Sequence, residues 1–170
     1  MSNAPAQPLD LQELLAALAS CGVEYLVIGG VAAQVHGRRR TTMDLAVIPA
    51  PDPENFERLA EVLIGLDAHP VELGPRAGAP TAEQLSVAPI VPPLRTRHGE
   101  LHILNQVPGA SAYAAMRTRS LKVDLDGIAV HIVGVDDLIR MKQTSGRPHD
   151  LEDIEAVTAA AREASAQGEP

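Results

Sequence analysis

The stretch from Glu24 to Pro49 constrains the fold of this chain more than any other part of the sequence. A short apolar run at 25–28 ends in Gly29-Gly30, and a second apolar run begins at Asp44. The segment between them starts with an Ala-rich helical pattern. This order predicts a strand, a short helix and a second strand, with glycines at the first junction and a carboxylate early in the second strand. Such an arrangement suits phosphate chemistry.

The same stretch lacks a residue that a metal site would need. Side chains two apart on a strand share one face, so a second carboxylate would be expected two residues after Asp44. That position is Ala46.

Length and composition favour a soluble globular protein. With 170 residues, 45% hydrophobic and 21% charged, the sequence predicts one domain over 1–170, with 1–8 and 165–170 frayed. The single cysteine, Cys21, excludes an intrachain disulfide and a cysteine-based metal site. No apolar run reaches the ~20 residues of a membrane span, and the first ten residues do not resemble a signal peptide. We therefore expect a cytoplasmic protein without a membrane partner.

The charge of the chain is unevenly distributed. The net charge of −8 argues against a surface that binds nucleic acid generally. Eleven of the 14 basic residues fall into four clusters, which would form a local positive surface if they converged and would be solvated side chains if they did not. The clusters are Arg38–Arg40; Arg95 and Arg97; Arg117, Arg119 and Lys122; and Arg140, Lys142 and Arg147.

Hydrophobic periodicity and turn residues predict an α/β (α+β) domain with a mixed sheet of four to six strands flanked by helices. Asp126-Gly127 gives the strongest hairpin signal. Thr81 is a plausible N-cap, and Gly22 a plausible residue after a helix end. The expected helices are 9–21, 31–35, 55–66, 81–85, 111–119, 135–143 and 151–164, and the expected strands are 25–28, 44–48, 94–96, 100–105, 121–125 and 128–133.

Several motifs together resemble a known family. Gly29-Gly30, His36-Gly37, Arg40, Thr42 and Asp44 follow the pattern GG…HG-x-x-R-x-T-x-D-x-D. This pattern resembles minimal nucleotidyltransferases of the polymerase-β-like superfamily, especially bacterial toxin–antitoxin and abortive-infection toxins. The resemblance covers roughly residues 10–160 and includes three further segments, Pro51–Asn55, Gly99–Leu104 and Asp137–Leu151.

The resemblance implies roles for individual residues. In such enzymes carboxylates hold two divalent cations, Mg²⁺ or Mn²⁺, that assist nucleotidyl transfer. The implied catalytic positions are Asp44, His102 and Lys142, with Asp44 as a metal ligand, and the implied nucleotide-binding positions are Gly29, Gly30, Arg40, Thr42, Lys142 and Asp150.

Structural roles compete with these. Lys142 could be a surface lysine, Asp150 could cap the last helix, and His36 could belong to a helix end. Arg40 and Thr42 could tether their loop instead of contacting phosphate.

The sequence departs from the family at the metal site. Ala46 replaces the second carboxylate and His102 the third, so only Asp44 remains. Glu100 is a possible substitute, and His102 could serve a softer ion or be a hydrogen-bonded histidine. Mg²⁺ prefers oxygen ligands, so two losses in one cluster predict impaired activity.

Three functions remain open. The chain is a degenerate, nucleotide-binding pseudoenzyme, an active toxin, or an inert scaffold or antitoxin. An active toxin would transfer NMP from NTP to a hydroxyl of RNA, such as tRNA, or of a protein, and would have a cognate antitoxin. We favour the first, because the glycines, Arg40 and Lys142 suit a polyanion, which an inert scaffold does not need.

Overall fold

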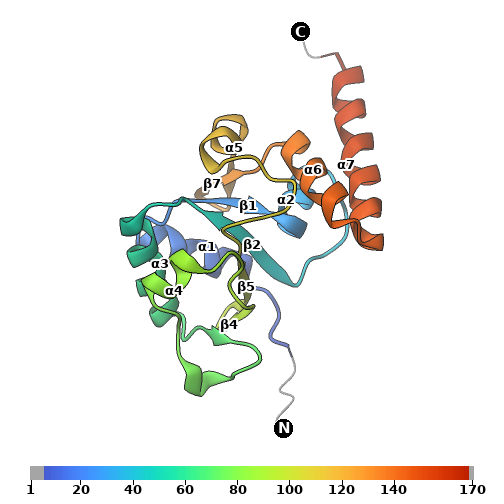
Figure 1. Ribbon diagram of the computed structural model, residues 1–170. Coiled ribbons are helices and arrows are strands. Elements are labelled where there is room, and N and C mark those ends of the chain that lie inside the picture. Colours follow the sequence, from blue (N-terminus) through green and yellow to red (C-terminus); the bar gives the residue numbers. More distant parts are fainter. Residues whose placement is uncertain (1–5, 169–170) are drawn as a thin grey trace.

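The computed structural model describes residues 6–168, which form helices on both sides of one sheet (Figure 1). The helices are α1 (Leu11–Ser20), α2 (Gly29–Val35), α3 (Pro53–Gly65), α4 (Ala82–Val87), α5 (Tyr113–Arg119), α6 (Val135–Ser145) and α7 (Pro148–Ala166), with a 3₁₀ turn at Pro75–Ala77. The strands are β1 (Tyr25–Ile28), β2 (Asp44–Pro49), β3 (His69–Pro70), β4 (Leu94–Thr96), β5 (Gly99–Ile103), β6 (Leu121–Leu125) and β7 (Ile128–Ile132).

The seven strands form a mixed sheet in the order β3-β4-β5-β2-β1-β7-β6. β2 pairs parallel with β5 and β1 pairs parallel with β7, and the other neighbours are antiparallel. The expected α/β class is confirmed, but the strand count exceeds the expected four to six. The unexpected strand is β3, whose two residues, one of them a proline, carry no alternating pattern.

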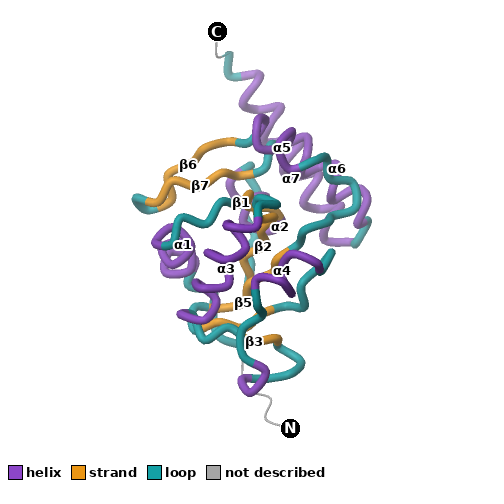
Figure 2. Tube along the Cα trace, turned by 60° about the vertical axis from the view of Figure 1, so that its left-hand side comes forward, coloured by secondary structure: helices purple, strands orange, loops and turns teal. Residues whose placement is uncertain are grey.

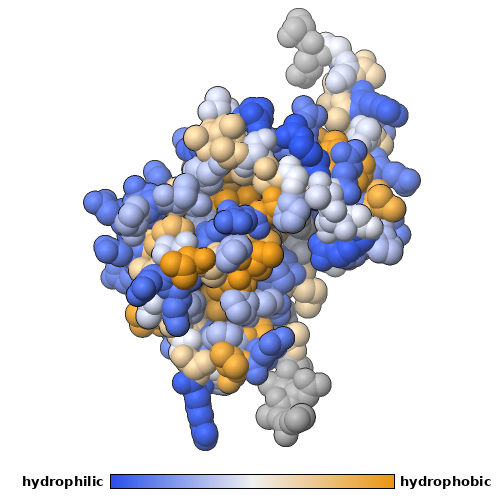
Figure 3. Space-filling model, in the orientation of Figure 1, coloured by the Kyte–Doolittle hydropathy of each residue, from blue (hydrophilic) through white to orange (hydrophobic). Residues whose placement is uncertain are grey.

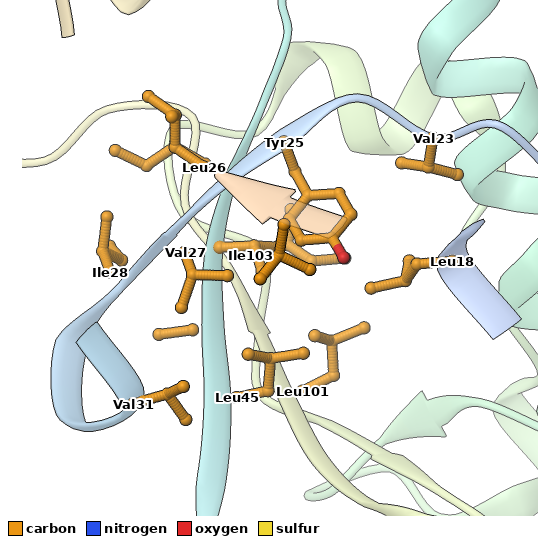
Figure 4. Packing of buried hydrophobic residues seen from close by; sticks show 14 of the residues in the cluster. Leu18, Val23, Tyr25, Leu26, Val27, Ile28, Val31, Leu45, Leu101 and Ile103 are labelled. Carbon is orange, nitrogen blue, oxygen red and sulfur yellow. The ribbon is translucent and has the colours of Figure 1, made fainter. Parts of the chain in front are cut away.

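One face of the sheet is an aliphatic core. Tyr25, Val27, Leu45 and Leu101 project from β1, β2 and β5 toward Leu18 of α1 (Figure 4). Leucines of α1 and α3, among them Leu14, Leu15, Leu59 and Leu63, complete this layer. Alternation along β5 explains the division, because Leu101 and Ile103 are buried while Glu100 and His102 between them are half-buried.

Local capping fixes where several helices begin. Thr81 accepts a hydrogen bond from the backbone N–H of Gln84, whose side chain accepts one from Thr81, so the predicted N-cap is confirmed. Gly22 adopts φ +66 after α1, as expected. The helix expected at 151–164 instead begins at Pro148.

Asp150 therefore does not occupy the N-cap position. The N-cap is Arg147, and Asp150 stands at the third helical position, where its Oδ2 accepts the backbone N–H of Arg147 at 3.3 Å. That capping alternative was wrong because Pro148, with its fixed φ, is favourable at the first helical position and starts the helix early.

The two chain ends are only partly described. Residues 165 and 166, which we expected to fray, form the last turn of α7. Gly99 packs against Leu9 and Pro8 near the start of the described chain. Residues 1–5 and 169–170 lie outside the described part. Across 6–168, no helix is long and apolar enough to cross a membrane.

Candidate functional site

The face of the sheet opposite the α1–α3 core carries the polar residues of β2 and β5. Asp44 lies beside Glu100, and Ala46 lies beside His102, in the parallel register of the two strands. Residues paired in this way project to the same side. The structure therefore brings Asp44, Ala46, Glu100 and His102 onto one face, as their spacing predicts. We call these four residues the strand group.

The strand group does not form a preformed metal site. His102 Nε2 lies 2.7 Å from Glu100 Oε1, and each side chain is about one-third exposed (32%). The Asp44 carboxylate makes no hydrogen bond or ion pair with residues 6–168. Within that range, no three His, Cys, Asp or Glu side chains are placed to hold a metal ion. Because Ala46 has no atom that could bind a metal and Glu100 is engaged by His102, the residues present do not fit the two-cation site that the sequence resemblance implies.

The glycine junction after β1 packs closely against the loop before β2. Gly29 adopts φ +68, which side-chain-bearing residues rarely adopt. A Cβ on Gly30 would lie 2.5 Å from Thr42 Oγ1, so only glycine fits there. The Thr42 hydroxyl also donates to the carbonyl of Asp44 at 3.3 Å. These contacts support the tethering role for Thr42.

Arg40 and His36 flank the same loop. Arg40 is exposed, and its carbonyl accepts a hydrogen bond of 2.7 Å from Gln34 Nε2. Its guanidinium forms no ion pair with the described residues. His36 caps the end of α2, and its Nε2 lies 2.8 Å from the carbonyl oxygen of Val133. The structural reading of His36 is therefore supported.

Lys142 is buried among carboxylates. Its Nζ lies 2.6 Å from Asp153 and 3.3 Å from Asp150, and only 8% of the residue is exposed. The alternative in which Lys142 is a surface lysine is wrong. Asp153 also forms an ion pair with Arg38, and Asp150 accepts a hydrogen bond of 2.9 Å from Arg147 Nε. We call these five residues the ion cluster; it joins the loop after α2 to α6 and α7.

The ion cluster carries three cations and two carboxylates. Burial acts to raise the pKa of Asp150, but hydrogen bonds from Arg147 and Ser145 and the charge of Lys142 outweigh it and lower the pKa to about 2. Arg38 lies against Asp153 with its Nη2 buried and without a hydrogen-bond partner among the described residues. Asp150 and Asp153 are both 1% exposed, so these charges depend on one another.

A pocket of about 340 Å³ lies between Ala46 of the strand group and the ion cluster. Gly29 and Ala46 line it on the sheet side, and Lys142, Arg147 and Asp150 line it on the helix side. The rest of its wall is mainly apolar and includes Leu104, Val107, Leu138 and Met141. Asp44 and His102 are not among the lining residues. We call this the candidate pocket.

A larger cavity, of about 860 Å³, opens beside it and shares Val107. It lies between the end of β2, α3, α4 and α5, and Figure 3 shows apolar side chains gathered on this side of the molecule. Tyr113 lines it, and burial raises the pKa of its hydroxyl against the opposing effect of Arg117. No sequence motif marks this cavity, because its walls come from three separate segments, 48–57, 82–86 and 105–116.

The basic clusters do not merge into one positive surface. Arg119 and Arg140 converge, but on buried Asp137, at 2.8 and 3.2 Å. Arg97 pairs with Asp67 at 2.9 Å. Arg38, Lys142 and Arg147 face the carboxylates of the ion cluster. Much of the basic charge is therefore neutralised locally.

Comparisons with known proteins identify the fold. No protein-family model matches the sequence, and no curated protein matches it. Solved structures do match: the Thermotoga maritima protein TM1012, a predicted nucleotidyltransferase, has a TM-score of 0.53 at 10% identity over 85% of this chain and 88% of its own.

Two further solved structures are similar to this chain in fold. ANT(2″)-Ia, in complex with adenylyl-2″-tobramycin, has a TM-score of 0.53 at 11% identity over 89% of this chain and 87% of its own. An antigenic nucleotidyltransferase-like protein of Paracoccidioides brasiliensis has a TM-score of 0.51 at 19% identity over 89% of this chain and 78% of its own. The fold is that of the nucleotidyltransferases.

Proposed function

We propose that this chain is a nucleotidyltransferase-fold protein that binds the phosphates of a nucleoside triphosphate weakly in the candidate pocket and transfers no nucleotidyl group at a useful rate. The observation that carries this proposal is the composition of that pocket. The cations Lys142 and Arg147 line it, whereas Ala46 stands where the family has its second carboxylate. The cations that attract an anion are present, whereas two of the three carboxylates expected to bind metal are replaced, by Ala46 and His102.

The hydrogen-bond capacity of the two cations supports weak binding. An ammonium group has three N–H donors, and Asp150 and Asp153 occupy two of those on Lys142. One donor is left for a phosphate oxygen. Arg147 uses its Nε for Asp150, while its side chain is 64% exposed, so its terminal nitrogens can reach a phosphate. Asp150 opposes both, which limits the affinity.

A binding experiment without metal tests the first half of the proposal. ATP and inorganic triphosphate, each titrated into the protein in EDTA and followed by NMR, are expected to shift the resonances of residues around the candidate pocket. Arg147→Ala is expected to weaken binding about tenfold, corresponding to ~1.4 kcal/mol. Arg76→Ala removes an exposed arginine outside the pocket and is the matched control. No binding of either ligand would move the weight to an inert scaffold or antitoxin.

A transfer experiment tests the second half. Radiolabelled NTPs are incubated with total tRNA and with the protein itself, first in Mg²⁺ and then in Mn²⁺. We expect no transfer. Robust labelling that disappears in Asp44→Ala would overturn the proposal in favour of an active transferase, in a cytoplasmic toxin with a cognate antitoxin.

One observation favours that second candidate. Asp44 and Glu100 are neighbours in the β2–β5 register, so two carboxylates share one face even though Ala46 is not acidic. A rotation of Glu100 away from His102 would bring its carboxylate within reach of a cation held by Asp44. Glu100→Gln distinguishes an active transferase from a nucleotide-binding protein without activity. It would abolish any metal-dependent transfer and leave metal-free ATP binding unchanged.

A further inference from the structure

The two edges of the sheet differ in how well they are protected. The edge formed by β3 has two residues and ends in Pro70, which cannot donate a hydrogen bond. The edge formed by β6 has five residues, pairs with β7 without a bulge and contains no proline. Figure 2 shows β6 as the outermost strand of its side. An edge of this kind presents unpaired backbone groups to another strand.

The hairpin geometry identifies those backbone groups. Asp126 and Gly127 have φ +54 and +86, as in a two-residue hairpin turn, so Leu125 and Ile128 form a hydrogen-bonded pair. Pairs of this type alternate along an antiparallel ladder. The N–H and C=O groups of Lys122 and Asp124 therefore point away from β7. No other backbone group within 6–168 reaches them.

We propose that a second copy of this chain pairs with β6 in antiparallel orientation, with the twofold axis at Val123. Hydrogen bonding requires that the outward groups at 122 and 124 face each other across the interface. Pairing 122 with 122, or 124 with 124, would oppose like charges. Pairing Lys122 of each copy with Asp124 of the other places a positive charge opposite a negative charge at both positions. Of the three pairings, only this one avoids opposing like charges, so it selects the register.

The apolar residues of β6 agree with that register. It places the two Val123 side chains opposite each other and Leu121 of each copy opposite Leu125 of the other. Leu121 is 48% exposed in the single chain, so the pairing removes apolar surface from water. The sequence LKVDL is self-complementary under a twofold axis, which is what an isologous interface requires. Because β1 and β7 lie between β6 and β2, this interface is separate from the candidate pocket.

Disulfide trapping tests the register. In a Cys21→Ser background, Val123→Cys is expected to form a covalent dimer on oxidation, since a non-hydrogen-bonded pair has Cα atoms about 4.5 Å apart. Leu125→Cys is the control: its two copies would lie about 14 Å apart, four residues along the strand, and would not cross-link. Mixing Leu121→Cys protein with Leu125→Cys protein should restore the cross-link. Equal cross-linking of all single variants would overturn the register.

Charge reversal tests the interface without cysteine. Sedimentation of the unmodified protein should show a concentration-dependent dimer, and Lys122→Glu should weaken it at least about tenfold. Asp124→Lys should do the same, although it also removes the hydrogen bond of 2.8 Å to Gly127 N–H, so circular dichroism must show that it folds. A one-to-one mixture of the two variants should dimerise, because both charge pairs become opposite again. A protein that stays monomeric at millimolar concentration, or a dimer that is indifferent to both reversals, would overturn the proposal.

Discussion

The strand group and the ion cluster, called here the strand side and the helix side, differ in how their polar groups are satisfied. On the strand side, Asp44 has no partner within 6–168, and the Glu100–His102 pair is one-third exposed. On the helix side, Arg38, Lys142, Asp150 and Asp153 are all at least nine-tenths buried, and Arg147 is exposed. Charges in water contribute little to folding, whereas a buried cluster becomes strongly destabilising when one member is removed. The helix side therefore supports the fold, and the strand side can change with little cost to stability.

The largest effect is expected from Asp153→Ala. This change leaves Lys142 and Arg38 without their shared carboxylate in a buried site, and we expect a loss of about 3–5 kcal/mol in the free energy of unfolding. Urea denaturation measures it. Glu155→Ala, at an exposed position of the same helix, should change stability by less than about 0.5 kcal/mol. If the two changes lowered the free energy of unfolding equally, burial of Asp153 in the ion cluster would not be what makes it important for stability.

A second prediction compares the two faces of β5. Leu101→Ala should lower stability by about 2–5 kcal/mol, since Leu101 is fully buried in the core. His102→Ala, one residue away, should cost less than about 1 kcal/mol, because its only polar partner among residues 6–168 is a partly exposed carboxylate. The same denaturation experiment compares them. A larger loss at His102 would show that the strand side does support the fold.

Acid should weaken the helix side selectively. The pKa of Asp150 is about 2, below its ordinary 3.8, so its ionised form is favoured in the folded protein. This stability is complete above about pH 4 and is lost as the pH falls toward 2, and it amounts to roughly 2 kcal/mol. Asp150→Asn should remove that part of the pH dependence. An unchanged slope in Asp150→Asn between pH 4 and 2 would contradict the assignment.

Features of the strand group and the ion cluster that depend on residues close together in the sequence were predictable, and features that depend on residues far apart were not. The strand group follows from alternation along β2 and β5, a local rule, and the register places its four residues on one face as expected. The hairpin at 121–133 and the N-cap at Thr81 were also predictable from neighbouring residues.

The surroundings of Lys142 were not predictable in this way. Its closest partner, Asp153, lies on the next helix, and Arg38 approaches from the loop after α2. No spacing rule connects these three residues. Asp153 had no counterpart in the motifs, although a lysine followed by two aspartates across a helix junction was a usable signal. The strand β3 was missed because two residues carry no periodicity.

The sharpest test of the strand side is Ala46→Asp combined with His102→Asp. Ala46 is 9% exposed, and its methyl faces Gly29, which has no side chain, so a carboxylate can extend toward the pocket cations. A new carboxylate at the buried position 46 costs stability, so circular dichroism must show that the variant folds. Mg²⁺ binding, measured by calorimetry, should strengthen by about tenfold or more, because four carboxylates, at positions 44, 46, 100 and 102, then share one face. Ala46→Asn with His102→Asn keeps the size and removes the charge, and should bind Mg²⁺ as weakly as the original protein. Tight Mg²⁺ binding by the unmodified chain would show that Asp44 and Glu100 already suffice, and the strand side would then be a working metal site.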